Sequence, residues 1–241
     1  KERAIHSQYD VVCVSSENIR ADYAGAFGID IDKVQALGVP RTDMFYKPHI
    51  IDAAKKQFFE EYPEYENKKI LLYCPTFREK NGRKVANDPQ IDWDIFSELL
   101  PPDVIMLIKN HPVIGKDLLG GKTFQNIANI KENTNTLMLV ADIMITDYSS
   151  VIFECCILNK PIIFYCPDYD EYERDFYFQF PEDTYGDFTV NQEELCEAII
   201  RNLRNPNLDK LTEFKEKYMG ACDGHSTEHV VDTIKMFLNE R

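Results

Sequence analysis

Residues 145–154 have the sequence Ile145-Thr146-Asp147-Tyr148-Ser149-Ser150-Val151-Ile152-Phe153-Glu154. They follow an apolar run, 137–145, that only Asp142 interrupts, and they lead into apolar residues spaced as in a short, largely buried helix. The first N–H groups of a helix have no partner within it and the helix dipole is positive there, so this junction can hold a phosphate. A simpler alternative is that Asp147 or Ser149 caps the helix. Under both interpretations the stretch predicts a strand, a polar turn and a helix.

Apolar runs of strand length alternate with helical patterns along most of the chain. The strand-like runs are 9–14, 34–39, 70–77, 104–109, 142–146 and 161–165, and the helical patterns between them are 17–27, 53–62, 93–100 and 149–158. Continuous apolar strands separated by helices indicate a parallel sheet with helices on both faces, so we expect an α/β protein. After Pro181 three more helices are expected, at 191–204 (opened by an Asn191–Glu194 capping box), 208–218 and 226–238. The polar stretch 79–90 is expected to be a mobile loop.

The N-terminal part is expected to differ from the rest. Tyr46-Lys47-Pro48 interrupts regular structure after the second predicted strand. Residues 1–47 hold only two predicted strands and one helix, which is too little for an independent core. We interpret them as the remnant of a larger N-terminal unit with its linker, and residues 48–241 as the main domain.

Composition and charge exclude several classes of protein. The 241 residues are 44% hydrophobic, ample for a packed core, and no apolar run approaches the roughly 20 residues that cross a bilayer. No signal peptide pattern opens the chain, so a soluble protein or fragment is expected. The net charge of −14 argues against nucleic acid, and against an anionic membrane, as partners of this part of the protein. A phosphorylated ligand would need the few available cations gathered in one pocket.

Polar side chains follow four of the predicted strands, the last of which ends in Cys166-Pro167-Asp168. At the other three ends the polar side chains are Thr76 and Arg78, His111, and Asp147, Ser149 and Ser150. The carboxyl ends of parallel strands share one edge of a sheet, so we expect the six groups to converge into a cradle for a diphosphate. Two simpler alternatives stand beside this prediction. His111, which Pro112 restricts to extended conformations, is then a structural hydrogen-bonding residue, and Arg78 is a surface cation.

Glu154 lies one turn inside the helix that begins near Ser149. An acid at this position either interacts favourably with the positive end of the helix dipole or binds both hydroxyls of a ribose. The absence of G-x-x-x-x-G-K-[ST], G-x-G-x-x-G and G-x-S-x-G disfavours P-loop NTPases, nicotinamide dehydrogenases and α/β-hydrolases.

No metal or cofactor is expected. His225 and His229 are four residues apart, but no Glu or Cys completes a zinc set around them. The acidic cluster of Asp168, Asp170, Glu171 and Glu173 is read as a solvated loop in preference to a Mg²⁺ site. The seven cysteines are odd in number and contain no C-x-x-C pair, which favours a reduced, cytosolic chain without structural zinc.

A series of short motifs, read in order, resembles the CDP-glycerol glycerophosphotransferase family, the teichoic acid primases and polymerases. The motifs are Leu37-Gly38-Val39-Pro40-Arg41-Thr42-Asp43, Cys74-Pro75-Thr76-Phe77-Arg78, Ile108-Lys109-Asn110-His111-Pro112, residues 142–154, Asn159-Lys160-Pro161-Ile162-Ile163-Phe164-Tyr165, Arg174-Asp175-Phe176-Tyr177-Phe178 and Asp223-Gly224. Each motif alone is weak, but their order and spacing span nearly the whole chain.

The resemblance implies a GT-B fold, in which two Rossmann-like halves enclose the active site, and this chain would be the C-terminal, donor-binding half. It implies transfer of glycerol phosphate, or a similar polyol phosphate, from a CDP-polyol to a hydroxyl of a lipid-linked teichoic-acid-like or capsular polymer, with release of CMP. His111 would act in catalysis. The residues implied to bind the donor are Thr76, Arg78, Asp147, Ser149, Ser150 and Glu154. No metal is implied.

The resemblance also bears on the whole protein. It implies a cytoplasmic enzyme, peripheral on the inner face of the cell membrane, that makes its membrane contact through a missing N-terminal half; a homo-oligomer is left open. The family's Trp-His-Gly-Thr-Pro-like motif, whose His is a proposed base, has no counterpart here, since the only tryptophan is Trp93. The fragment alone is therefore expected to bind the donor without completing transfer.

Two departures from the family pattern leave the identity of the polyol open. His229 stands where the family usually has Arg, and Tyr185-Gly186-Asp187-Phe188 replaces a Pro-Gly-Pro-like turn. Two rival functions remain: a GT-B glycosyltransferase or epimerase that uses a UDP-sugar, and a non-catalytic, flavodoxin-like nucleotide-binding domain.

Overall fold

A computed structural model describes residues 5–80, 83–86, 88–110, 117–172 and 178–239. Its centre is a six-stranded sheet in which every neighbouring pair is parallel. The strands lie in the order β10-β9-β8-β3-β6-β7. They are β3 (Lys69–Cys74), β6 (Val104–Ile108), β7 (Ile127–Asn129), β8 (Ile143–Thr146), β9 (Ile162–Tyr165) and β10 (Asp187–Thr189). Along the chain, β6 and β7 are added on one side of β3, and β8, β9 and β10 are then added on its other side. The strand order therefore reverses between β3 and β8, as in doubly wound nucleotide-binding sheets.

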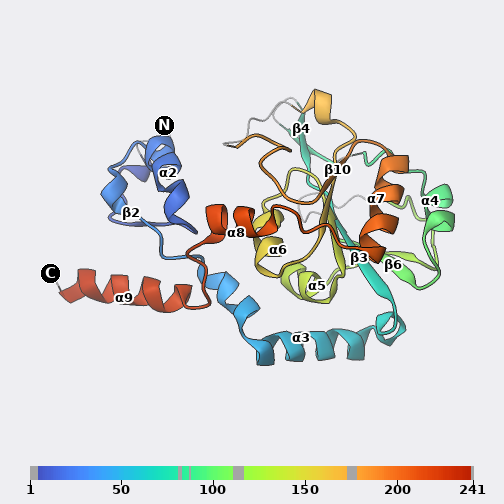
Figure 1. The fold of residues 1–241 in the computed structure, drawn as a ribbon, viewed down its shortest axis with the longest axis horizontal. Helices are drawn as coiled ribbons and strands as arrows, with labels where there is room; N and C mark the ends of the chain where they lie inside the picture. Colours follow the sequence, from blue (N-terminus) through green and yellow to red (C-terminus); the bar gives the residue numbers. More distant parts are fainter. Residues whose placement is uncertain (1–4, 81–82, 87, 111–116, 173–177, 240–241) are drawn as a thin grey trace.

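Helices cover both faces of the sheet (Figure 1). Leu71 and Tyr73 of β3 pack with α4 (Trp93–Leu99) and α7 (Gln192–Arg204), because alternate side chains of a strand point to opposite faces. Ile70 and Leu72 belong to the opposite core, with α5 (Thr134–Val140), α6 (Val151–Ile157) and α8 (Leu211–Met219). The expected parallel sheet covered on both faces is confirmed.

The N-terminal residues form a small unit of their own. Strands β1 (Val12–Cys13) and β2 (Val34–Gln35) pair in a separate two-stranded sheet. Between them lie η1 (Glu17–Ile19), α2 (Arg20–Phe27) and η2 (Ile31–Lys33). The chain then passes through η3 (Pro40–Tyr46), α3 (Pro48–Glu61) and η4 (Pro63–Tyr65) into the main sheet. The predicted break at Tyr46-Lys47-Pro48 falls between η3 and α3, while the division into two units at that point stays a prediction.

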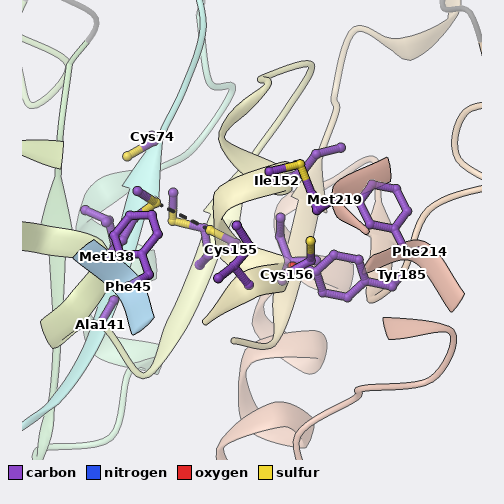
Figure 2. Packing of buried hydrophobic residues seen from close by; sticks show 14 of the residues in the cluster. Phe45, Cys74, Met138, Ala141, Ile152, Cys155, Cys156, Tyr185, Phe214 and Met219 are labelled. Carbon is purple, nitrogen blue, oxygen red and sulfur yellow. Dashed lines mark hydrogen bonds between the residues drawn. The ribbon is translucent and has the colours of Figure 1, made fainter. Parts of the chain in front are cut away.

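Figure 2 shows how η3 joins the main core. Phe45 lies beside Met138 of α5, and the Sγ atom of Cys155 lies 3.7 Å from the Sδ atom of Met138. On the other side of α6, Cys156 lies near Tyr185 and Met219. Cys155 and Cys156 are thus small apolar core residues, and burial raises the pKa of the Cys156 thiol to about 12.

Asp43 of η3 links the N-terminal segment to the C-terminal helix α9 (Ser226–Asn239). Its carboxylate is buried and accepts hydrogen bonds from the N–H groups of Ser226 (2.9 Å) and Thr227 (2.8 Å). Burial alone would raise the pKa of Asp43, but the hydrogen bonds from these two residues outweigh it and lower the pKa. Asp43 is therefore an ionised cap on the first turn of α9, supplied from 183 residues away.

Two glycines allow the segments around Asp43 and α9 to approach each other. A Cβ atom at Gly38 would lie 2.5 Å from the carbonyl oxygen of Ala221, and one at Gly224 would lie 2.8 Å from the Cβ of Tyr46. Both glycines have positive φ, +79° and +93°, a conformation that disfavours other residues. The segments around the motifs 37–43 and 223–224 therefore pack closely on each other.

Several local predictions need correction. The stretch predicted as a loop, 79–90, contains most of an antiparallel pair, β4 (Arg78–Lys80) with β5 (Arg83–Val85). The apolar run 137–145 is divided between α5 and β8, because a short buried helix and a buried strand have the same continuous apolar pattern. The short strands β7 and β10 were not anticipated. The predicted cap of α7 by Asn191 is confirmed, since Asn191 Oδ1 accepts the Glu194 N–H at 2.9 Å. The Glu194 carboxylate reaches back to the Val190 N–H at 2.9 Å, one residue before the position that a capping box predicts.

None of the described helices combines the length and hydropathy of a membrane-spanning segment.

Replacing Asp43 by alanine is expected to lower the free energy of unfolding by about 1–3 kcal/mol. The reason is that the N–H groups of Ser226 and Thr227 lose the buried carboxylate that accepts their hydrogen bonds. Urea unfolding of parent and variant measures the loss. Asp92→Ala is the matched control: Asp92 caps α4 in the same way, through the Asp94 and Ile95 N–H groups, but is exposed. A loss of about 0.5–1 kcal/mol is expected there. Equal losses would show that burial of the cap does not matter.

Candidate functional site

The predicted site residues after β3 and β8 meet at the point where the strand order reverses. The backbone N–H of Thr76 donates to both carboxylate oxygens of Asp147, at 3.0 and 3.1 Å. The hydroxyl of Thr146 donates to the carbonyl of Cys74 at 2.7 Å. Ligands of open α/β sheets bind at the carboxyl ends of strands on either side of such a reversal. The two hydrogen-bonded strand ends therefore fix the floor of a candidate donor site.

Arg78 lies in this floor and links three strand ends. Its Nη1 lies 2.9 Å from Asp147 Oδ2 and donates to the Thr76 hydroxyl at 3.0 Å. Its Nε and Nη2 donate to the two carboxylate oxygens of Asp168, which follows β9, at 2.5 and 3.0 Å. The guanidinium carbon also lies 4.9 Å from the centre of the Tyr148 ring. Arg78 is only 8% exposed, so the alternative of a surface cation is wrong.

The charges of this cluster are strongly coupled. Burial opposes the charge of Arg78, but its hydrogen bond with Asp168 and the charge of Asp147 raise its pKa further, so the guanidinium stays protonated. Burial would raise the pKa of Asp168, yet the Arg78 guanidinium holds it below its usual value. Burial raises the pKa of Asp147, against the opposing effect of Arg78. The positive charge of Arg78 is thus balanced by Asp147 and Asp168, so this cluster attracts an anionic ligand only weakly.

The two serines of the junction have different environments. Ser149 Oγ accepts the Val151 N–H at 3.3 Å, a bond to the first residue of α6 that is compatible with the helix-capping alternative. Ser150 is exposed and its side chain makes no capping bond to α6. Asp147, in contrast, lies at 1% exposure beneath them. Contact of these residues with a phosphate stays a prediction.

Glu154 is paired with a residue that sequence reasoning did not single out. Its side chain is 8% exposed, and one carboxylate oxygen accepts a short hydrogen bond from Nη2 of Arg41 in η3. The only signal for Arg41 was its position as the sole cation of the motif 37–43. Binding of a ribose by Glu154 stays a prediction.

His111, the predicted catalytic residue, lies outside the described residues. Within the described ranges, no group of three His, Cys, Asp or Glu side chains could hold a metal ion. His225 and His229 face different acids, with His225 Nδ1 lying 2.9 Å from Glu228 and His229 Nε2 lying 4.0 Å from Asp223. The expectation of a reaction without a metal or cofactor stays a prediction.

Residues 1–236 match the family model described as CDP-Glycerol:Poly(glycerophosphate) glycerophosphotransferase. The chain belongs to this family. A teichoic acid poly(ribitol-phosphate) polymerase of Bacillus spizizenii is 38% identical over 237 residues, which are 95% of this chain and 38% of the relative. A teichoic acid ribitol-phosphate primase of the same organism is 33% identical, over 97% of this chain and 61% of the relative. The chain therefore spans between about two-fifths and three-fifths of the length of these relatives.

Solved structures agree with the family. The wall teichoic acid polymerase TagF, in a variant soaked with CDPG, superposes with a TM-score of 0.79 at 25% identity, over 98% of this chain and 59% of that one. A UDP-GlcNAc 2-epimerase of Neisseria meningitidis has a TM-score of 0.61 at 18% identity, over 94% of this chain and 62% of that one, and shows the fold alone. The recognised family and the Rossmann-like α/β half of a GT-B fold are confirmed.

Arg78→Met is expected to lower the free energy of unfolding by about 3–5 kcal/mol, because it leaves the buried Asp147 and the half-buried Asp168 without their cation. Urea unfolding at pH 7 measures this loss. The deficit is expected to shrink between pH 7 and pH 5, since unpaired buried carboxylates have raised pKa values and lose their charge as the pH falls.

The control for Arg78 is Arg201→Met. Arg201 lies 3.2 Å from Asp187, but its side chain is 55% exposed, so a loss of about 0–1 kcal/mol is expected. A small loss in both variants would contradict a structural role of the buried cluster.

Proposed function

We propose that the protein to which this chain belongs transfers a polyol phosphate from a CDP-polyol to a hydroxyl of a teichoic-acid-like polymer and releases CMP. In this proposal the chain supplies the donor-binding lobe. The match of residues 1–236 to the family model carries the proposal. The position of the junction 145–154 at the reversal of strand order supports it, because that is where nucleotides bind in such sheets. The UDP-sugar alternative has support only from the shared fold.

Transfer begins when the acceptor hydroxyl attacks the β-phosphorus of the donor. A new P–O bond forms, the bond from the β-phosphorus to the bridging oxygen breaks, and CMP leaves with that oxygen. Such phosphoryl transfer depends mainly on positioning and on stabilising charge. We assign hydrogen bonding of the diphosphate to Thr76, Ser149 and Ser150. The Arg78 cluster keeps the strand ends that carry them in place.

His111 completes the proposed set of residues. Because it follows β6, next to β3 in the sheet, its position along the chain supports a place beside the diphosphate. There an imidazole would stabilise charge on the leaving phosphate. The proposed reaction uses no metal or cofactor.

The relatives favour ribitol phosphate over glycerol phosphate as the transferred group. Those named for ribitol phosphate are 31–38% identical to the chain, and those named for glycerol phosphate 25–29%. A lipid-linked polymer as acceptor, and a cytoplasmic location on the inner face of the membrane through a part of the protein outside this chain, belong to the same proposal. Assembly of the protein into a homo-oligomer is compatible with this proposal.

Calorimetry with CDP-ribitol, CDP-glycerol, CMP and UDP-GlcNAc tests the proposed function. The chain is expected to bind the cytidine nucleotides, and CDP-ribitol more tightly than CDP-glycerol, without measurable affinity for UDP-GlcNAc. An assay of CMP release with a lipid-linked acceptor is expected to show no turnover by these 241 residues. Preference for the UDP-sugar would support the rival function, and binding of none of the four would contradict both.

Ser150→Ala is expected to weaken binding of CDP-ribitol by about 1–3 kcal/mol, the cost of losing a hydrogen bond to a charged group. The melting temperature should not change, because Ser150 is exposed and caps nothing. Ser97→Ala is the control, since Ser97 lies on α4 and donates only to its own helix, to the Asp94 carbonyl. Unchanged affinity in the Ser150 variant would remove this serine from the phosphate site.

A further inference from the structure

Three polar side chains form a row of hydrogen bonds at the carboxyl ends of β6 and β7. Asn110 lies two residues after β6, Asn129 is the last residue of β7, and Asp117 lies between the two strands along the chain. Nδ2 of Asn110 donates to Oδ1 of Asn129 at 3.1 Å, and Nδ2 of Asn129 donates to Oδ1 of Asp117 at 2.7 Å. Because β6 and β7 are parallel to β3 and β8, this row lies at the same edge of the sheet as the candidate site.

Asp117 determines which way the amide of Asn129 points. The carboxylate also accepts the N–H groups of Gly121 at 2.7 Å and Leu119 at 3.0 Å, and these bonds, with the one from Asn129, lower the pKa of Asp117. An ionised carboxylate only accepts hydrogen bonds, so the NH₂ group of Asn129 has to face it. The amide oxygen of Asn129 is then left to face Asn110. The row therefore has one direction of donation, from Asn110 through Asn129 to Asp117.

The row holds both ends of a short segment. Asn110 and Asp117 are the residues immediately before and immediately after 111–116, which begins with the predicted catalytic histidine. Asn129 binds both of them and is itself fixed in the sheet, where it pairs with Ile108 of β6. Fixing the two ends of a chain segment reduces the conformations that the residues between them can adopt.

We propose that Asn129 is a positioning residue, which holds the two ends of 111–116 and thereby sets where His111 lies relative to the leaving phosphate. The inference rests on the proposed function, in which His111 stabilises charge on that phosphate, and it adds a residue that acts through His111. A group that is held in place before the substrate binds needs no ordering during the reaction. Displacing such a group by about 1 Å can lower a rate about a hundredfold.

Asn129→Asp in the full-length protein tests the inference by turnover. The substitution keeps the size of the side chain but places a second carboxylate against Asp117, so the row of hydrogen bonds is broken. The rate of CMP release at saturating CDP-ribitol is expected to fall about ten- to hundredfold, with a much smaller change in KM for the donor. Adding Asp117→Asn supplies a new NH₂ donor opposite the new carboxylate, so the double variant Asn129→Asp/Asp117→Asn is expected to recover part of the lost rate.

Asn207→Asp is the matched control. Nδ2 of Asn207 donates to Oδ1 of Asp187 at 3.1 Å, and Asp187 is the first residue of β10, the strand at the opposite edge of the sheet. This substitution changes the charge by the same amount and also sets two acids against each other, but away from β6 and β7. It is expected to lower the melting temperature without changing the rate per folded molecule.

The histidine ring signals in NMR spectra of the 241-residue chain give a readout that does not depend on turnover. The chain has five histidines, and His111→Gln identifies the signal of His111. Asn129→Asp is expected to shift this signal and to leave the others in place. Asn207→Asp is expected to leave all of them in place.

The readouts separate failure of this inference from failure of the proposed function. With a parent that releases CMP from CDP-ribitol, an unchanged rate or an unchanged His111 signal in Asn129→Asp overturns this inference alone. Equal losses of rate per folded molecule in Asn129→Asp and Asn207→Asp also overturn it, because they show a general effect of charge. If Asn129→Asp does not fold, Asn129→Ala gives the same comparison, since it removes the row without adding a charge.

Two outcomes reach beyond Asn129. Parental turnover by His111→Gln overturns the proposed role of His111, and this inference with it. A parent that turns over no CDP-polyol overturns the proposed function as well.

Discussion

The buried cluster of Arg78, Asp147 and Asp168 is the constraint on which the rest of the site depends. It joins the ends of β3, β8 and β9, three neighbouring strands of the sheet. Removing charges from water is costly, so a buried cluster persists only where hydrogen bonds compensate each charge. Here the Thr76 N–H and hydroxyl supply additional bonds to Asp147 and Arg78. The polar edge of the sheet is thereby held in one arrangement, which a site for a flexible diphosphate requires.

A second constraint lies at the interface between the chain's early and late segments. Asp43 caps α9, the hydroxyl of Tyr46 donates to the Cys222 carbonyl, and Ala221 donates its N–H to the Ser15 carbonyl at 2.9 Å. These contacts fix η3 against the end of the chain. Since η3 also carries Arg41, the ion pair of Arg41 with Glu154 of α6 depends on packing at the C-terminal helix.

The sequence alone allowed prediction of the sheet because its strands are buried on both faces and appear as continuous apolar runs. The same continuity hid α5, since the residues 137–140 are as apolar as the strand that follows them. The polar strand ends predicted which residues approach one another, as Thr76 and Asp147 do. Partners could not be predicted where they depend on tertiary structure: Asp168 lies 90 residues from Arg78, and Arg41 lies 113 residues from Glu154. No local pattern encodes such distances.

An acidic protein that binds a phosphorylated ligand has to keep its cations away from its own carboxylates. The chain has a net charge of −14, and the most buried arginine of the candidate site is already neutralised by two acids. A site built from Arg78 alone would repel a diphosphate, since the cluster carries one negative charge when both acids are ionised. The neutral hydroxyl of the exposed Ser150 does not have this defect. If the ligand is anionic, as proposed, it is therefore bound mainly by groups other than Arg78.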